Sequence, residues 1–341
     1  MQTETLEPKY TAKDFATDQD VRWCPGCGDY SILKQMQSTM AEAGIDKKDI
    51  VFVSGIGCSS RFPYYMDTYG IHSIHGRATA MASGLKASRP DLSVWIITGD
   101  GDSLSIGGNH LIHLLRRNFN VNILLFNNEI YGLTKGQYSP TSPKGQVTKS
   151  TPMGSLDHPF NPQALALGAD ATFVARTMDR DPKHMRDVLK IANDHQGTSL
   201  VEIYQNCNVF NDGAFEVYTD KASKAETTIM VEEGQPLIFG QERDKGIRLN
   251  GMKPEIVSLK DCSADELWIH DSSDRMKATI LSRMFDNNAL EGGLPRPFGV
   301  FYQEDRFRYE EAMQAQVEQA ISIKGEGDLD KLIRGGHYWT V

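Results

Sequence analysis

Residues 93–128 read SVWIITGDGDSLSIGGNHLIHLLRRNFNVNILLFNN, and the pattern of this stretch decides the fold. Its two apolar runs, 93–98 and 121–126, each predict a buried strand. The first run enters a G-D-G-D turn that carries Asp100, and the second enters a pair of asparagines that ends at Asn128. We therefore expect the two strands to deliver these side chains to one edge of a sheet, where α/β proteins bind their ligands.

Both ends of the stretch have the chemistry of a divalent-metal and diphosphate site. Mg²⁺ prefers oxygen ligands, which the Asp100 carboxylate, the Asn128 side-chain amide and the Ile130 carbonyl could supply. The glycines of the turn let a diphosphate approach the backbone, and a helix predicted from about Leu104 to residue 117 would present its N–H groups to the phosphates. Either half alone would read as an ordinary turn, but the two together favour a cofactor site.

The rest of the chain, up to about residue 211, alternates short apolar runs with helical patterns. Such alternation predicts the α/β class, with a doubly wound and mostly parallel sheet. A segment rich in Gly, Ser, Thr and Pro, 131–152, is long for a plain connection and is expected to be a functional loop. The predicted helices are 29–44, 76–88, 162–168 and 182–195, and the predicted strands are 49–53, 171–175 and 199–204.

Changes in composition divide the 341 residues into three predicted segments. A polar arm covers 1–20, a cofactor- and metal-binding domain covers 21–211, and a C-terminal extension covers 212–341. The extension is too polar to predict an independent core, so we expect it to pack on the first domain or on a partner. Helical patterns within it run over 264–284 and 304–323.

The composition is that of a globular protein, with 24% charged residues and a net charge of −9. This acidic balance argues against nucleic-acid binding as the main role. No apolar run approaches the roughly 20 residues that a membrane span needs. The N-terminus also lacks the basic region and apolar core of a signal peptide. We therefore expect a cytoplasmic protein that does not bind membranes.

Five cysteines in such a chain suggest metal binding or catalysis rather than disulfides. Cys24 and Cys27 form a CxxC pair, Cys58 lies in a glycine turn, Cys207 follows a predicted strand, and Cys262 is a bystander in a polar stretch. An iron–sulfur cluster accepts widely separated thiolates, whereas zinc sites usually show two close pairs. A thioredoxin-like pair would leave Cys58 and Cys207 unexplained. The spacing by itself gives a modest preference for the cluster.

The chain resembles the beta subunit of the 2-oxoacid:ferredoxin oxidoreductases, most of all the 2-oxoglutarate type. The G-D-G turn and the later N-N pair are together similar to the thiamine-diphosphate fingerprint. The resemblance covers about residues 20–212 and thins out afterwards. It is carried by W-C-P-G-C-G at 23–28, G-I-G-C-S at 55–59, H-G-R-A at 75–78, G-D-G-D at 99–102 and N-N-E-I-Y-G-L-T-K-G-Q at 127–137.

The resemblance implies a thiamine-diphosphate-binding fold that holds Mg²⁺ and one 4Fe–4S cluster. It implies oxidative decarboxylation of a 2-oxo acid, in which electrons pass singly through the cluster to ferredoxin and coenzyme A takes the acyl group. The reaction would be reversible. A separate alpha subunit would complete the substrate site and supply the glutamate that activates the cofactor.

Family roles are carried over by position. The implied cluster ligands are Cys24, Cys27, Cys58 and Cys207, and the implied Mg²⁺ ligands are Asp100, Asn128 and Ile130. The candidate cofactor-binding residues are Gly57, Cys58, His75, Gly99, Asp100, Gly101, Asp102, Asn128 and Ile130. Cys207 departs from the pattern, because Asn206 precedes it where the family often has proline.

A dicarboxylic substrate such as 2-oxoglutarate needs a cation for its distal carboxylate. The candidate catalytic residues are Lys135, just after the metal ligands, Arg61, just after a cluster cysteine, and His75. Lys135 and Arg61 could instead be surface charges or phosphate contacts, and His75 could be a helix-terminal residue bonded to the backbone. We favour substrate binding for Lys135 and weigh the two interpretations evenly for the others.

Two alternatives remain open at this point. The first is the same reaction on pyruvate or on branched-chain 2-oxo acids. The second comes from another class, a non-catalytic zinc-binding scaffold on a degenerate thiamine fold. The intact Asp100 and Asn128 argue against degeneracy.

Overall fold

The computed structural model describes residues 10–284, 293–336 and 339. Its centre is an eight-stranded sheet with the strand order β2-β1-β3-β4-β8-β7-β13-β9. The pairs are parallel except for β13, which runs antiparallel to β7. The strands are β1 (Ile50–Ser54), β2 (Tyr69–His72), β3 (Ser93–Gly99), β4 (Val121–Asn127), β7 (Phe173–Met178), β8 (Ser199–Tyr204), β9 (Thr228–Val231) and β13 (Arg296–Gln303). This sheet confirms the predicted α/β class.

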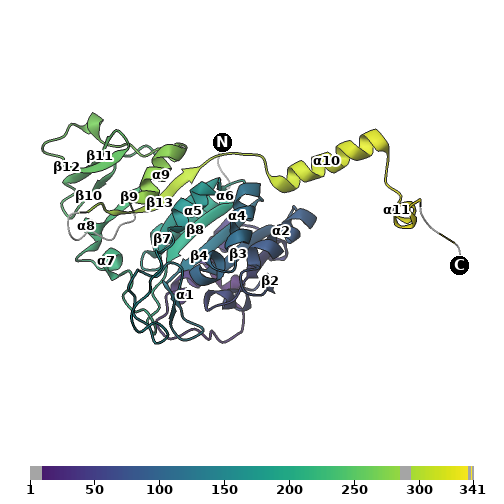
Figure 1. Cartoon of the computed structure of the whole chain (residues 1–341), viewed down its shortest axis with the longest axis horizontal. Helices are drawn as coiled ribbons and strands as arrows, with labels where there is room; N and C mark the ends of the chain where they lie inside the picture. Colours follow the sequence, from purple (N-terminus) through teal and green to yellow (C-terminus); the bar gives the residue numbers. More distant parts are fainter. Residues whose placement is uncertain (1–9, 285–292, 337–338, 340–341) are drawn as a thin grey trace.

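Helices cover both faces of the sheet (Figure 1). Side chains alternate along each strand, so Val94 and Ile96 of β3 join one apolar core while Trp95 and Ile97 join the other. The first core is covered by α2 (Ala78–Ser88), α4 (Gly108–Arg117), α5 (Pro162–Gly168) and α9 (Arg275–Arg283). The second is covered by α1 (Asp29–Ala43) and α6 (Pro182–Asp194). Two-sided burial explains the near-continuous apolar runs of the central strands.

The helix predicted from about Leu104 to residue 117 is wrong in its start, because the structure has two helices there. A short α3 (Asp100–Leu104) begins inside the G-D-G-D turn, and α4 begins at Gly108. The chain turns sharply between them, and Gly107 sits so close to Asp102 that a Cβ would lie 2.5 Å from its carbonyl oxygen. The first helix after β3 therefore begins at Asp100, earlier than predicted.

Other boundaries also move. The strand predicted at 171–175 is β7, which starts two residues later, at Phe173. The helix predicted over 264–284 is reduced to a single 3-10 turn, η4 (Ala264–Glu266), and α9. Asp274 caps α9 by accepting the N–H groups of residues 276 and 277, which fixes its late start. The helix predicted over 304–323 is α10 (Tyr309–Lys324).

The segment after residue 211 contributes to the central sheet and also extends away from it. Its strands β9 and β13 form one end of the sheet. Strands from both sides of residue 211 therefore share one sheet, and the domain boundary at residue 211 stays a prediction. A smaller antiparallel sheet lies beside them, and α10 leads to α11 in an arm that projects from the body (Figure 1). These further elements are α7 (Glu216–Thr219), α8 (Lys224–Thr227), β10 (Ile238–Phe239), β11 (Lys245–Asn250), β12 (Lys253–Ser258) and α11 (Leu329–Arg334).

Short elements complete the described chain. Residues 1–9 of the predicted arm 1–20 lie outside the described residues. The remaining part contains η1 (Ala12–Phe15), whose Phe15 is fully buried. Two more 3-10 helices are η2 (Lys47–Asp49) and η3 (Ser59–Tyr65). The predicted functional loop contains a small hairpin, β5 (Ile130–Tyr131) with β6 (Gln137–Tyr138). Within the described residues, none of the helices has the length and apolar character needed to cross a membrane.

Candidate active site

The site lies where β3 and β4 end side by side. Gly99 of β3 pairs with Phe126 of β4, so Asp100 and Asn128 follow at the same edge of the sheet, as predicted. A narrow cavity of about 100 Å³ lies here. All of the candidate cofactor-binding residues line it: Gly57, Cys58, His75, Gly99, Asp100, Gly101, Asp102, Asn128 and Ile130.

Asp100 is buried and is held by hydroxyl groups of the functional loop. Its Oδ2 accepts hydrogen bonds from Ser139 at 2.5 Å and from Thr141 at 2.6 Å. Burial raises the pKa of the Asp100 carboxyl, and the two hydroxyls lower it in part. A divalent cation beside this carboxylate would stabilise its charged form, so the surroundings of Asp100 fit a metal ligand.

The two asparagines have different surroundings. Asn127 is buried, and its side-chain amide donates to Glu202 at 2.8 Å. Asn128 lines the cavity, where its Nδ2 donates to Gln205 at 2.8 Å and its Oδ1 accepts the Ile130 N–H at 3.2 Å. The amide of Asn128 is thereby oriented. Its oxygen, the Asp100 carboxylate and the Ile130 carbonyl are the kinds of ligand that Mg²⁺ prefers.

The first turn after β3 is packed against Tyr131. A Cβ on Gly101 would lie 2.1 Å from the Tyr131 ring, and the Tyr131 hydroxyl donates to the Gly101 carbonyl at 3.0 Å. The same ring meets His75 edge-on, with 6.4 Å between the ring centroids. Glycine is therefore required here for close packing of the cavity wall.

His75 is anchored by Asp102. The Nδ1 atom of His75 lies 2.5 Å from Oδ1 of Asp102, whose side chain is buried. Asp102 therefore lines the cavity while its carboxylate is engaged by groups of this chain. His75, predicted as a catalytic residue, lines the same cavity as the candidate Mg²⁺ ligands.

Four of the five cysteines come together beside this cavity. A Cβ on Gly132 would lie 3.5 Å from the Cys58 sulfur and 3.7 Å from the Cys207 sulfur. Cys27 interacts electrostatically with both of these thiols, and Cys58 interacts with Cys24. The glycine thus leaves space beside the Cys58 and Cys207 sulfurs, which come from loops far apart in the sequence.

Two of these thiols, Cys27 and Cys58, lie in a largely buried and acidic setting, whereas Cys24 is exposed. Burial raises the pKa of Cys58 to about 12 and raises that of Cys27 further, and the charge of Asp29 adds to both effects. A coordinated metal would reverse this preference, because it binds the thiolate. All five cysteines are free, and Cys262 lies in the C-terminal region beside Glu266. Over the described ranges, no three His, Cys, Asp or Glu side chains form a group that could hold a metal ion.

Neither of the two cation candidates, Lys135 and Arg61, lines the cavity. Lys135 is exposed on the β5–β6 hairpin with a left-handed backbone, φ 77°, two residues beyond the cavity-lining Leu133. Arg61 does not line the cavity; it donates to the Tyr65 hydroxyl at 3.0 Å and lies over the Tyr64 ring. Lys135 therefore follows two cavity-lining residues in the sequence, whereas Arg61 contacts neighbouring tyrosines.

Sequence reasoning missed several residues that shape the site. Ser139 and Thr141 bind Asp100, and Gln205 orients Asn128. Glu129 lies beside the predicted ligands, and burial raises the pKa of its carboxyl to about 8. The hydroxyl-rich run S-P-T-S in the functional loop was a visible signal, whereas the other residues carried none.

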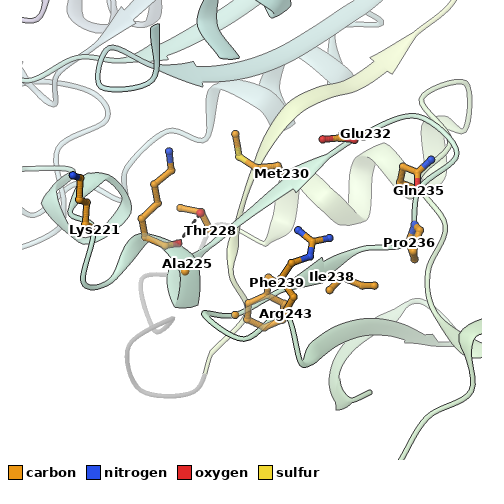
Figure 2. Close-up of a pocket in the computed structure, with 12 residues that line it drawn as sticks. Lys221, Ala225, Thr228, Met230, Glu232, Gln235, Pro236, Ile238, Phe239 and Arg243 are labelled. Carbon is orange, nitrogen blue, oxygen red and sulfur yellow. Dashed lines mark hydrogen bonds between the residues drawn. The ribbon is translucent and has the colours of Figure 1, made fainter. Parts of the chain in front are cut away.

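A larger cavity, of about 630 Å³, lies elsewhere, between α8, β9 and β10. Figure 2 shows Met230, Phe239 and Arg243 around it, and Lys224 also lines it. Lys224 is paired with Asp181 at 2.8 Å. None of the candidate site residues lines this cavity.

Comparison with known proteins shows where this arrangement recurs. Residues 55–203 match the model of the C-terminal TPP-binding domain of thiamine pyrophosphate enzymes. The chain is 52% identical to 2-oxoglutarate oxidoreductase subunit KorB of Mycobacterium tuberculosis, over 99% of this chain and 90% of that protein. It is 37% identical to the 2-oxoacid:ferredoxin oxidoreductase subunit beta of a Sulfolobus species, over 91% of this chain and 93% of that protein.

A solved structure has the same fold along nearly the whole chain. It is a 2-oxoglutarate:ferredoxin oxidoreductase from Magnetococcus marinus with 2-oxoglutarate, coenzyme A and succinyl-CoA bound. The TM-score is 0.76 at 34% identity, over 98% of each chain. These relatives confirm the predicted resemblance and the thiamine-diphosphate-binding fold. The chain therefore belongs to the family of 2-oxoacid:ferredoxin oxidoreductase beta subunits.

Proposed function

We propose that this chain is the beta subunit of a 2-oxoglutarate:ferredoxin oxidoreductase. The complex would convert 2-oxoglutarate and coenzyme A into succinyl-CoA and CO2 and pass two electrons to ferredoxin. The observation that carries the proposal is the single cavity whose wall contains both the candidate Mg²⁺ ligands and the thiol of Cys58. Electrons released in this cavity would need to travel only a short distance to a cluster held by the four thiols.

The chain would contribute the diphosphate end of the cofactor site. Asp100, Asn128 and the Ile130 carbonyl would hold Mg²⁺, and Gly99 and Gly101 would let a diphosphate approach the backbone. When bound, thiamine diphosphate would supply the chemistry that decarboxylates the 2-oxo acid. The residues of this chain would bind and orient the cofactor. Their contacts with the functional loop would hold these residues in place before the cofactor binds.

The choice of 2-oxoglutarate is supported by a charged residue that directly follows the cavity lining in the sequence. Lys135 is exposed beside the cavity-lining residues Leu133 and Thr134, so its ammonium group could pair with the distal carboxylate of a dicarboxylic substrate. Relatives named for 2-oxoglutarate, in M. tuberculosis and M. marinus, support the same choice. Arg61 lies outside the cavity lining, and we now regard it as the weaker candidate.

An alpha subunit of the same complex would cover part of this chain. The C-terminal arm, α10 and α11, projects from the body (Figure 1). Several of its apolar side chains are exposed. Exposed apolar surface of this kind is typical of subunit interfaces. The apolar residues concerned are Val317, Ile321, Leu329, Leu332 and Ile333.

The cluster assignment is tested by metal analysis of the full chain, expressed with its partner subunit and purified without oxygen. We expect a brown protein with about four irons per chain and little zinc. Cys58→Ser should lose most of the iron, whereas Cys262→Ser, in the distant thiol, should keep it. A wild-type protein with one zinc and no iron would overturn the assignment and favour the zinc scaffold.

The substrate assignment is tested by Lys135→Gln, with Lys144→Gln as a matched control in the same loop. Both lysines are exposed, so neither change should affect folding. We expect Lys135→Gln to raise KM for 2-oxoglutarate by about tenfold or more, the effect of losing one charge-assisted contact, and to leave pyruvate turnover unchanged. Unchanged KM for 2-oxoglutarate, or faster turnover of pyruvate by the wild type, would contradict the proposed substrate.

A further inference from the structure

Asp102 receives an unusual number of hydrogen bonds for a residue within a short helix. Its Oδ1 accepts the backbone N–H of Gly76 at 2.7 Å and that of Ile56 at 3.1 Å, and it lies 2.5 Å from Nδ1 of His75. Its Oδ2 accepts the Thr98 hydroxyl at 2.8 Å. The carboxylate therefore connects the end of β3, the glycine turn after β1 and the segment that leads into α2.

The backbone around this carboxylate is shaped to admit it. A Cβ on Gly55 would lie 1.9 Å from Oδ2 of Asp102. Gly76 has φ 70°, in the left-handed region, and a Cβ there would lie 2.5 Å from the backbone nitrogen of Gly107. Both glycines thus allow the chain to close around Asp102, so its position is built into the fold.

These contacts decide where the His75 proton resides. A carboxylate only accepts hydrogen bonds, so the short contact to Oδ1 places a proton on Nδ1 of His75. Within the described chain no hydrogen bond engages Nε2, and the side chain of His75 is 40% exposed in the cavity wall. In the neutral ring, Nε2 therefore carries the free lone pair. Tyr131 packs edge-on against the ring and limits its rotation.

We propose that Asp102 is a positioning residue that fixes the tautomer and orientation of His75, so that His75 Nε2 is the proton-accepting group of the cavity. The imidazolium formed when Nε2 takes a proton would be stabilised by the adjacent Asp102 carboxylate, while the substrate or cofactor atom that gave the proton keeps the bonding electron pair. The proposal rests on the proposed function only in that this cavity is the active site. A purely structural Asp102, which merely joins three segments, is the alternative.

A double-mutant cycle in the purified complex separates the two. Asp102→Asn keeps an oxygen for the backbone N–H groups and presents an NH2 to the Thr98 hydroxyl, which can rotate to accept it. We expect kcat to fall by about 30-fold or more and KM to change by less than about threefold. The kcat of His75→Gln should fall by a similar factor. Adding Asp102→Asn to His75→Gln should lower kcat little further, because both changes remove the same function. His72→Gln, in the exposed strand β2, serves as the control that retains activity.

Nitrogen NMR of the full chain, labelled at histidine and free of cofactor, gives a readout independent of activity. The His75 signals are identified by their loss in His75→Gln. In the wild type we expect the shift of an unprotonated Nε2 and a protonated Nδ1. In Asp102→Ala, which removes the oxygen that accepts from Nδ1, we expect a mixture of tautomers.

The outcomes are decisive in both directions. A wild-type His75 protonated at Nε2, or a double mutant whose losses multiply, would overturn the positioning role. If Asp102→Asn lowers activity only in proportion to a lost melting temperature, the structural alternative holds instead. If the NMR result is as expected but the complex oxidises no 2-oxo acid, the proposed function fails and the positioning of His75 stands.

Discussion

Replacing Gly101 by alanine is a sharp test of how the site is packed. The new Cβ would lie 2.1 Å from one carbon of the Tyr131 ring and 2.6 Å from the next, whereas carbon atoms in contact prefer about 3.5–4 Å. The ring must therefore move by more than about 1 Å, and the 3.0 Å hydrogen bond from its hydroxyl to the Gly101 carbonyl must break.

The expected cost follows from these two losses. Forced repacking costs about 1–3 kcal/mol, and a lost hydrogen bond costs about 0.5–1.5 kcal/mol. Alanine recovers up to about 1 kcal/mol of backbone entropy in a helix. We expect a net loss of about 2 kcal/mol in the free energy of unfolding, measured by urea denaturation of the full chain followed by circular dichroism.

A matched glycine provides the control. Gly84 lies in α2, and a Cβ there would meet no atom within 4 Å, so Gly84→Ala should stabilise the chain by up to about 1 kcal/mol. Tyr131→Ala should relieve the clash, so the double variant with Gly101→Ala should lose much less than the sum of the two single changes. The reasoning is refuted if Gly101→Ala behaves like Gly84→Ala, or if the two losses simply add.

Three further predictions concern the rest of the fold. Arg176→Met should cost about 3–5 kcal/mol of unfolding free energy, because it removes the 2.7 Å ion pair with Glu202 and both side chains are fully buried; a loss below about 1 kcal/mol in urea denaturation would contradict this. Burial lowers the pKa of His195 to about 4, below the value of about 6.5 in the unfolded chain. The contribution of this residue to stability is therefore fully present above about pH 6.5. As the pH falls from about 6.5 towards 4, the unfolded chain takes up the proton first and this contribution is lost. His195→Gln should therefore shrink the loss of stability between pH 7 and pH 5 by about 1–2 kcal/mol; an unchanged loss would count against it. A chain shortened to residue 325, which lacks α11, should unfold at the same urea concentration as the full chain but bind the alpha subunit more weakly in a pull-down assay.

The parts of the fold that the sequence predicted are those with strong local patterns. The buried runs of β3 and β4 each end at a polar turn, so both the strands and the edge that carries Asp100 and Asn128 follow from local rules. The cysteine loops and the His75 motif were tied to the same site by family resemblance. That Cys58 and His75 line one cavity is a tertiary fact. The cysteine spacing alone left the choice between a cluster and zinc open.

The missed features depend on contacts between distant segments. Between α3 and α4, Gly107 packs against the Asp102 carbonyl. The sequence of 104–117 does not predict that contact. The strand β13 contains Pro297 and Gly299 and bulges where it pairs with β7, so its sequence lacks the regular pattern of a strand, and none was predicted there. The hydrogen bonds that hold Asp102 also depend on distant segments, whereas its predicted contact with the cofactor stays a prediction.

The central claim concerns electrons that leave a 2-oxo acid in one cavity through thiol-bound iron. The most direct measurement is the rate of ferredoxin reduction by the anaerobically purified complex on addition of 2-oxoglutarate, coenzyme A, thiamine diphosphate and Mg²⁺. We predict rapid reduction with 2-oxoglutarate, slower reduction with pyruvate, and none with Asp100→Asn, whose metal ligand is weakened. An iron-loaded complex that leaves ferredoxin oxidised with every 2-oxo acid, or an Asp100→Asn complex that reduces it at the wild-type rate, would contradict the account.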